Sequence, residues 1–130
     1  MSRTLAADRC PCGSGLALAS CCGPFLTGAA IPATALALMR SRYTAYATGD
    51  TSYLLATWHP STRPASVETP AAARWIGLDI RNHQSTGTGR AVVEFVALFK
   101  VAGRAQRLHE ASRFVLEDGR WLYLDGQTPA

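Results

Sequence analysis

The feature that most constrains this chain is a group of four cysteines inside thirteen consecutive residues. Cys10 and Cys12 flank a proline, and Cys21 and Cys22 follow after eight intervening residues. A segment this short has too few apolar side chains for a core of its own, so something else must hold it. Four thiolates at the corners of a tetrahedron are a ligand set that structural zinc takes. The spacing therefore predicts one zinc ion bound by all four cysteines, with glycines at positions 13 and 15 allowing the chain to reverse.

Two other uses of these cysteines are open, namely two disulfides or a set of unrelated buried thiols. The first nine residues, MSRTLAADR, contain no apolar segment typical of a secretion signal. No apolar run approaches the ~20 residues of a membrane span. We therefore expect a cytoplasmic protein, in which thiols stay reduced, and this favours zinc over disulfides. Because four protein thiolates leave no position for water or substrate, the ion is expected to be structural.

The net charge does not by itself indicate nucleic-acid binding. The chain has thirteen basic and nine acidic residues, a formal charge of +4, and zinc bound to four thiolates would lower this to about +2. All the basic residues except Lys100 are arginines, and they are scattered from Arg3 to Arg120 without a run. A scattered distribution is typical of a solvated surface, so nucleic acid is not expected as a partner.

The sequence between the cysteine segment and residue 73 predicts helices. Apolar and aromatic residues recur at spacings of three and four, which is the pattern of one helix face: Leu36, Met39, Tyr43 and Tyr46. Pro32 suits the first helical position, and Gly49 suits a left-handed helix end. A second helix is predicted over 51–58, with Asp50 as its N-cap. Residues 69–73 could form one further helical turn.

From Arg74 onward the apolar pattern changes to a period of two, which predicts strands. The first strand places Ile76, Leu78 and Ile80 on one face and Trp75 on the other. Three more strands, joined by short turns, are predicted over 90–101, 106–117 and 120–125. The strand 90–101 is apolar on both faces, which is typical of a central strand covered on both sides. Helices followed by four consecutive strands predict an α+β fold, with helices on one face of an antiparallel sheet.

The cysteine segment also resembles a known module. Cys10-Pro11-Cys12-Gly13-Ser14-Gly15 followed by Cys21-Cys22-Gly23 resembles the SEC-C motif, a zinc module similar to the C-terminal tail of the SecA translocation ATPase. The resemblance implies a zinc knuckle over 1–24 that binds a partner protein, in SecA the export chaperone SecB, or ribosomes. Typical modules carry lysines where this chain has Leu16-Ala17-Leu18-Ala19-Ser20. We therefore do not expect SecB or ribosomes as partners, and these apolar residues could instead dock on the protein's own main domain.

The remainder of the chain resembles the YchJ-like family of bacterial proteins. Several segments carry the resemblance in the same order: Leu38–Tyr43, Thr57–Pro60, Trp75–Leu78, Glu110–Phe114 and Trp121–Gly126. It implies a nuclear-transport-factor-2-like (cystatin-like) cone over 25–130, in which helices pack against a curved antiparallel sheet. Cones of this kind often enclose a pocket.

The strand 106–117 suggests which polar residues would line such a pocket. Glu110 shares a predicted face with Leu108 and Phe114, and a carboxylate on an apolar face must be paired, hydrogen-bonded or protonated. Arg40 lies beside the apolar stripe of the first helix, so we predict an Arg40–Glu110 pair. This pair is either a structural ion pair between helix and sheet or part of a ligand site. The full set of candidate pocket residues is Arg40, Tyr43, Trp58, His59, Glu110 and Ser112.

Two functions are compatible with the sequence. No set of acid, base and nucleophile is recognisable, so no catalytic residue is assigned. The first function is that of a non-catalytic adaptor, in which the zinc knuckle and the cone bind a protein partner. The second is a small-molecule-binding protein or enzyme that uses the pocket around Glu110 and Arg40. The second function predicts an open, partly polar cavity between helix and sheet, whereas a closed apolar core would count against it.

Overall fold

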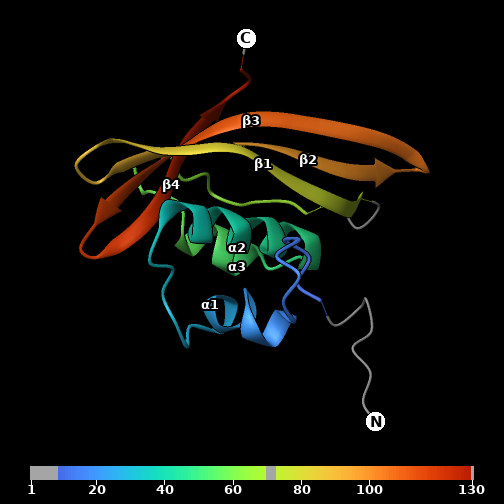
Figure 1. The fold of residues 1–130 in the computed structure, drawn as a ribbon, viewed down its shortest axis with the longest axis horizontal. Helices are drawn as coiled ribbons and strands as arrows, with labels where there is room; N and C mark the ends of the chain where they lie inside the picture. Colours follow the sequence, from blue (N-terminus) through green and yellow to red (C-terminus); the bar gives the residue numbers. More distant parts are fainter. Residues whose placement is uncertain (1–8, 70–72, 130) are drawn as a thin grey trace.

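The fold is described from a computed structural model that covers residues 9–69 and 73–129. Within these residues the chain forms one 3₁₀ turn, three α-helices and four β-strands: Leu18–Ser20, α1 (Gly23–Thr27), α2 (Ala35–Thr48), α3 (Thr51–Ala56), β1 (Ala73–Gly87), β2 (Arg90–Val101), β3 (Arg104–Glu117) and β4 (Arg120–Gln127). The strands form one sheet in the order β1-β2-β3-β4, with every neighbouring pair antiparallel. The sheet curves around α2, and the helices lie on one of its faces (Figure 1). The predicted α+β fold is therefore confirmed.

Some predictions fall partly outside the described residues. The predicted knuckle includes residues 1–8, and the additional helical turn over 69–73 includes residues 70–72. Ala73, the last residue of that turn, is the first residue of β1. Among the described residues, none of the helices combines the length and apolar character needed to cross a membrane.

Helix α2 begins three residues later than Pro32 suggested. Thr34 is its N-cap, because the Thr34 side chain accepts a hydrogen bond from the Ala37 N–H at 3.0 Å. Gly49 ends the helix in the left-handed conformation, with φ 80°, as predicted. Asp50 caps α3 by accepting from the Tyr53 N–H at 3.1 Å, also as predicted. The second helix is shorter than expected, since it ends at Ala56.

The two-residue turns set the register of the sheet. Asp118 and Gly119 both have positive φ, 52° and 78°, which matches the twist of the strands they connect. Ala102 and Gly103 adopt a similar pair of values, 53° and 78°. The predicted hairpin at 118–119 is therefore confirmed, and the tight turn at 102–103 extends β3 two residues beyond its expected start.

A bulge in β1 changes which side chains face the helices. Trp75 pairs with Phe99 and Gly77 pairs with Leu98, so Ile76 is an extra residue in the ladder. Trp75 therefore shares the inner face with Leu78 and Ile80, while Ile76 is exposed on the outer face. The prediction that Ile76 shares a face with Leu78 and Ile80, opposite Trp75, was wrong, because a strict period of two does not survive a bulge.

The outer face of the sheet is not covered by any helix of the described chain. Strand β2 lies inside the sheet, as predicted, but Leu98 on its outer face is 42% exposed. The outer face is lined instead by ion pairs such as His109–Glu94 and Arg113–Asp125. The expectation that β2 is covered on both sides was therefore wrong, although its inner side is buried.

Helix α2 has three contact sides. Its first side meets the sheet through Met39, Arg42, Tyr43 and Tyr46. Its second side meets the cysteine segment, where Arg40 and Thr44 are one helical turn apart. Its third side meets α3, where the Ser41 hydroxyl lies 2.6 Å from the Tyr53 hydroxyl. The helix is thus sandwiched between the sheet and the N-terminal segment (Figure 1).

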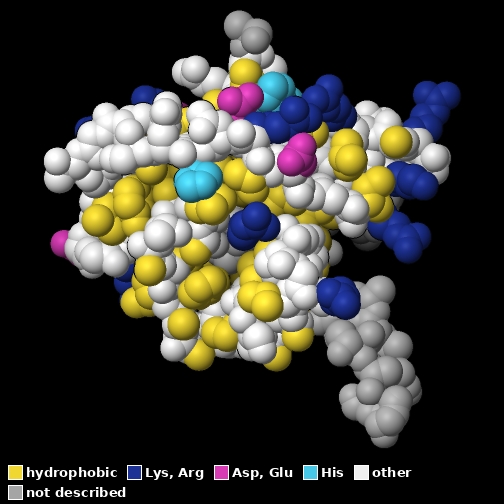
Figure 2. All heavy atoms as spheres, viewed as in Figure 1, with side chains coloured by type: hydrophobic (Ala, Val, Ile, Leu, Met, Phe, Trp, Pro, Cys, Tyr) yellow, Lys and Arg dark blue, Asp and Glu magenta, His cyan; other side chains and the backbone are white. Residues whose placement is uncertain are grey.

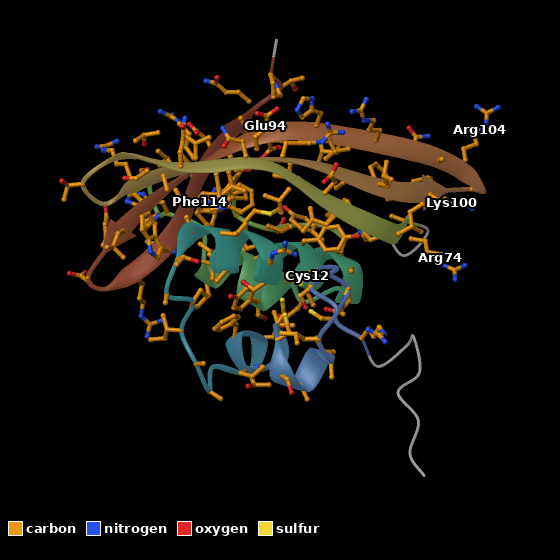
Figure 3. The ribbon with its side chains drawn as sticks, viewed as in Figure 1. Cys12, Arg74, Glu94, Lys100, Arg104 and Phe114 are labelled. Carbon is orange, nitrogen blue, oxygen red and sulfur yellow. The ribbon has the colours of Figure 1, made fainter. Side chains whose placement is uncertain are left out.

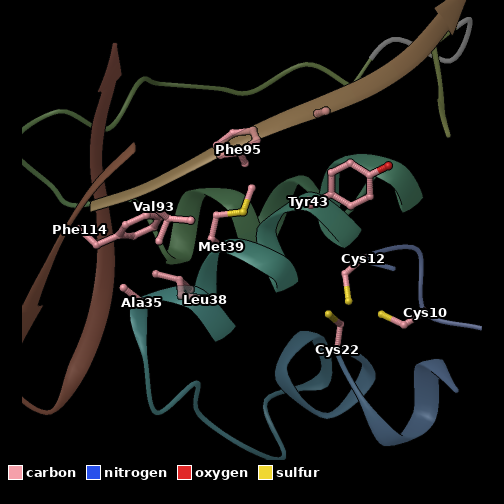
Figure 4. Close-up of a cluster of buried hydrophobic side chains, with 11 residues drawn as sticks. Cys10, Cys12, Cys22, Ala35, Leu38, Met39, Tyr43, Val93, Phe95 and Phe114 are labelled. Carbon is pink, nitrogen blue, oxygen red and sulfur yellow. The ribbon is translucent and has the colours of Figure 1, made fainter. Parts of the chain in front are cut away.

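One buried cluster runs from the cysteines to the sheet. It joins Cys10, Cys12 and Cys22 to residues of α2, and through these to Val93 and Phe114 of the sheet (Figure 4). The division of the chain at residue 24 stays a prediction. Helix α1 runs across that boundary, from Gly23 to Thr27.

Candidate functional site

The four cysteine sulfurs converge on one point beside α2. All four lie within 4.8 Å of one another, with separations of 3.6 Å between Cys12 and Cys21 and 4.0 Å between Cys21 and Cys22. Cys10, Cys12 and Cys22 are buried, while Cys21 is partly exposed. The described residues thus contain a cluster that could hold one metal ion through four sulfurs.

Local hydrogen bonds hold the two cysteine pairs in place. The Cys10 N–H donates to the Leu16 carbonyl at 2.9 Å, which closes the loop between the pairs. The Ser14 hydroxyl donates to Cys21 Sγ at 3.1 Å. Cys22 precedes α1, and its carbonyl accepts from two N–H groups in the first turn of that helix. Gly13 and Gly15 both have positive φ, 82° and 86°, which lets this short loop reverse.

The thiols strongly influence one another's ionisation. A hydrogen bond from Cys22 lowers the pKa of Cys12 to about 4, although burial opposes this. The same contact, together with burial, raises the pKa of Cys22 well above its ordinary value. Burial raises the pKa of Cys21. Because a metal binds thiolates, a cation in this cluster would replace the shared protons.

The surface of the knuckle, defined here as residues 9–27, is partly apolar. Leu16 is 53% exposed, and Ala17 and Ala19 are exposed as well. Only Leu18 of this run packs against the buried cluster. That cluster includes the cysteines of the knuckle itself, and the idea that the apolar residues between the cysteine pairs dock on the main domain fails for Leu16, Ala17 and Ala19.

A cavity lies between α2 and the inner face of the sheet. Its volume is about 210 Å³, and it is lined by Met39, Arg42, Tyr43, Tyr46, Trp75, Phe95, Ala97, Leu108, Glu110, Ser112, Phe114 and Tyr123. Six of the lining side chains are aromatic, and Trp75 stacks on Phe99 with ring centres 4.7 Å apart. The inner side of this domain therefore contains a partly polar cavity beside the buried apolar cluster.

Glu110 occupies a niche that strands β3 and β4 build together. The alternation of β3 brings Glu110 and Ser112 to the inner face, as predicted, and the Ser112 hydroxyl donates to Glu110 Oε2 at 2.6 Å. The Tyr123 hydroxyl donates to the same oxygen at 3.3 Å. Gly126, paired with Ser112, leaves room for this arrangement, since a methyl group at position 126 would overlap the Glu110 carboxylate.

Arg42 is the cation of the cavity wall. It is 5% exposed, and its Nη1 donates to the Leu54 carbonyl at 2.8 Å and to Thr57 Oγ1 at 2.7 Å. Its guanidinium carbon lies 4.5 Å from the ring centre of Tyr123 and 5.0 Å from that of Trp58. Burial lowers the pKa of Arg42, and neighbouring phenols and Glu110 oppose this. An arginine nevertheless stays charged inside a protein.

The predicted Arg40–Glu110 pair was wrong, because the two residues lie on different sides of α2. Arg40 Nη1 donates to the Cys12 carbonyl at 2.9 Å and so ties α2 to the knuckle. Arg42, not Arg40, shares the cavity with Glu110. An α-helix turns by about 100° per residue, so side chains two positions apart point to nearly opposite sides of the helix. Arg40 therefore faces the knuckle, and Arg42 faces the cavity.

The other candidate residues divide between the cavity and its surroundings. Tyr43, Glu110 and Ser112 line the cavity. Trp58 does not line it; its ring packs edge-on against Tyr123, and its buried Nε1 has no acceptor among the described residues. His59 lies outside, where its Nε2 is 2.9 Å from Glu117 Oε2.

Sequence reasoning missed Arg42, Tyr46 and Gly126, and it considered Trp75 and Tyr123 for a pocket mouth or an interface without placing them among the candidate pocket residues. The helical pattern contains a signal for Arg42, since residue 42 falls on the same stripe as Met39 and Tyr46. Trp75 was assigned to the wrong face because the bulge is not visible in the sequence. Gly126 has a role only because of a side chain sixteen residues earlier in the chain.

Four basic side chains gather at the end of the sheet farthest from α1. Arg74 lies directly opposite Lys100 in the β1–β2 ladder. Arg104 and Arg107 follow on β3, and all four are exposed. Figure 2 shows basic side chains at this end, and Figure 3 labels Arg74, Lys100 and Arg104 there. No carboxylate of the described chain forms an ion pair with any of them.

The chain matches known families over both of its parts. Residues 34–126 match the family described as YchJ, middle NTF2-like domain, and residues 7–24 match the SEC-C motif. A UPF0225 protein of Ralstonia nicotianae is 55% identical over 129 residues, covering 90% of this chain and 89% of that protein. A UPF0225 protein of Methylibium petroleiphilum is 56% identical over 120 residues, covering 91% of this chain and 87% of that protein.

Two solved structures have a similar fold. The solution structure of a SEC-C motif containing protein from Rhodopseudomonas palustris has a TM-score of 0.82 at 34% identity, covering 93% of this chain and 98% of that one. The crystal structure of a SEC-C motif containing protein from Psychrobacter arcticus has a TM-score of 0.76 at 29% identity, covering 93% of this chain and 82% of that one. This chain therefore belongs to the YchJ-like UPF0225 family, in which a SEC-C motif precedes an NTF2-like domain.

Proposed function

We propose that this protein binds a small organic molecule in the cavity between α2 and the sheet. The observation that carries the proposal is the pair of opposite charges in the cavity wall. Arg42 and Glu110 both line the cavity, yet no ion pair joins them within the described chain. A buried pair with a purely structural role is expected to close into direct contact, because desolvated charges need a partner.

The cavity wall also has the general composition of a ligand site. Such sites are mostly apolar and aromatic, with a few polar groups that orient the bound molecule. Here the rings of Tyr46, Trp75 and Phe95 supply apolar surface, while Glu110 and Ser112 supply polar atoms. The volume of about 210 Å³ is below the usual ~300–1,000 Å³ range of drug-sized ligands, so the ligand is expected to be small.

The proposal can be tested by fragment screening with the full-length, metal-loaded protein. Two-dimensional NMR spectra should show bound fragments shifting the Trp75 indole signal and the Ser112 amide. Gly126→Ala should abolish these shifts, because the added methyl group displaces the Glu110 carboxylate. Glu94→Gln is the matched control, since Glu94 pairs with His109 on the outer face. The proposal fails if fragments bind only elsewhere, or if no fragment binds.

We further propose that the metal of the cysteine cluster is zinc and that its role is structural. Zn–S bonds of ~2.3 Å require sulfur–sulfur separations of about 3.8 Å at the corners of a tetrahedron. Two of the separations, 3.6 and 4.0 Å, fit this requirement, all of them are within 4.8 Å, and four cysteines leave no open position for water. Bound metal would supply stability here, and a reducing cytoplasm would keep the ligands as thiols. Native mass spectrometry should find one zinc per chain, and a different metal would contradict the proposal.

A protein-binding role for the knuckle is a second candidate function. The observation that favours it is the exposed apolar surface at Leu16, Ala17 and Ala19, which α2 and the sheet do not cover. Leu16→Glu should remove a bound partner in affinity purification without changing zinc content, because the side chain is exposed. Arg104→Glu, an exposed change on strand β3 of the sheet, is the control. An unchanged set of partners with Leu16→Glu would count against an adaptor role.

A further inference from the structure

The wall of the cavity carries one positive and one negative charge. Arg42 keeps its charge when buried, and Glu110 Oε2 accepts hydrogen bonds from Ser112 and Tyr123, which stabilise a carboxylate. Tyr123 lies between the two charges, with its ring near the guanidinium and its hydroxyl on the carboxylate. This part of the wall, in which Arg42 is buried and Glu110 is half-buried, is therefore close to neutral as a unit.

Both charged groups have hydrogen-bonding capacity that the protein itself does not use. Arg42 donates from Nη1 to the Leu54 carbonyl and to Thr57, and it also interacts with the Tyr46 phenol, so about two of its five N–H groups remain as donors. Those that Glu110 receives from described residues all end on Oε2, so Oε1 remains as an acceptor. The cavity thus presents a donor and an acceptor to the same enclosed space.

The charge balance restricts what can fill this space. A ligand with a net charge would satisfy one of the two groups and leave the other facing a like charge at low dielectric, which is costly. A neutral head group carrying both a donor and an acceptor satisfies both. Beyond the polar end, Trp75, Phe95 and Met39 offer apolar surface for the rest of the molecule.

We infer that the cavity takes a small molecule without net charge, in which an apolar body carries an amide-like head group. An N–H of the head group donates to Glu110 Oε1, and its carbonyl oxygen accepts from the Arg42 guanidinium. This inference rests on the proposed function and adds the chemical class of the ligand to it. Nothing in the two family matches assigns a ligand to this cavity.

Three probes of nearly equal shape separate the possible charge preferences. Phenylacetamide offers a donor and an acceptor without charge, phenylacetate offers acceptors with a negative charge, and phenethylammonium offers donors with a positive charge. NMR titration of the zinc-loaded full chain should give phenylacetamide a dissociation constant at least about tenfold lower than either charged probe, because each of these leaves one buried group unpaired. Tighter binding of either charged probe overturns the inference.

A single variant should reverse the preference. Glu110→Gln keeps the side-chain shape and a carbonyl acceptor but leaves Arg42 as the only charge in the wall. Phenylacetate should then bind about tenfold more tightly than it does to the unmodified protein, and phenethylammonium more weakly. Glu94→Gln, on the outer face, removes the same charge from the molecule and should change neither. Equal effects of the two variants would mean that only overall charge matters, and would overturn the inference.

The outcomes also separate this inference from the function on which it rests. If other fragments bind in the cavity but phenylacetamide does not, the ligand class is wrong and the binding function stands. If no fragment of any kind perturbs the Trp75 and Ser112 signals, the proposed function fails and the ligand class fails with it.

Discussion

The knuckle and the cavity lie on two sides of the same helix, but they are built in different ways. The four sulfurs of the knuckle come from a thirteen-residue segment and meet through local turns. The cavity takes its wall from α2 and from all four strands, so residues from Met39 to Tyr123 contribute to it. With the proposed zinc bound, the knuckle would depend on metal chemistry, whereas the cavity depends on the packing of the whole domain.

This difference implies that the two regions should respond to different perturbations. Removing the metal removes the strongest interactions of the knuckle and leaves the ladders between β1, β2, β3 and β4 unchanged. Changing a cavity residue should alter ligand binding and leave the metal in place. Arg40 is the point where the two could be coupled, because it joins α2 to the backbone of Cys12.

The largest effect should follow from metal removal. Apparent binding energies of structural zinc are about 10 kcal/mol or more in small domains. A strong chelator should therefore unfold residues 9–27, while the sheet stays folded. Hydrogen exchange would show this as lost protection at Leu26 with retained protection in β2 and β3. Loss of protection throughout the chain would contradict the claim that the two regions unfold separately, because the knuckle and the cavity would then form one cooperative unit.

Arg42→Met should give the next largest loss of stability, and it changes a residue of the cavity wall. The change leaves the Leu54 carbonyl and Thr57 without their donor and removes the cation from the ring of Tyr123. We expect the free energy of unfolding to fall by about 2–4 kcal/mol, as measured by urea denaturation of the zinc-loaded protein. Zinc content should not change. Concurrent loss of zinc would show that the two sides of α2 are not independent.

Arg40→Met is the matched change on the knuckle side, and its effect should be smaller. It removes one hydrogen bond, from Nη1 to the Cys12 carbonyl, which is only partly buried. The expected loss of stability is about 1 kcal/mol, with faster release of zinc to a chelator and unchanged fragment binding in the cavity. If fragment binding weakens while zinc release stays the same, the assignment of Arg40 to the knuckle is wrong.

The smallest effect is expected for Lys100→Glu, which touches neither region. Lys100 lies opposite Arg74 in the ladder, and like charges at directly opposed positions destabilise a sheet. Replacing one of them by its opposite should raise stability by about 0.2–1 kcal/mol, while zinc content and fragment binding stay the same. The same denaturation and titration experiments measure these quantities. A change in zinc content or in fragment binding would indicate long-range coupling through the sheet.

The knuckle could be predicted from the sequence because its information is local. Cysteine spacing, glycine positions and the chemistry of sulfur all refer to neighbours within a few residues. The α+β fold could be predicted for a similar reason, since the change from helical to strand period at Arg74 and the turn at Asp118 are local signals.

The cavity could be predicted only in part. Glu110 and Ser112 were placed correctly because alternation along one strand is reliable where the strand has no bulge. Arg40 was predicted to pair with Glu110 because it lies near the apolar stripe. Arg42 lies near the same stripe, and only the position of the knuckle decides which side each one faces. Trp75 was placed on the wrong face because one extra residue in β1 reverses the alternation.

The contacts of helix α2 restrict insertions and deletions of residues more strongly than substitutions. Each residue turns the helix by about 100°. The three sides of the helix contact three different neighbours, namely the sheet, the knuckle and α3. A substitution affects only the neighbours that its own side chain contacts. Deleting or inserting a single residue in its first turn would rotate every later side chain, so that the contacts to the knuckle, the cavity and α3 would fail together. Over evolutionary time we expect this helix to change by replacement of residues and not by insertion or deletion.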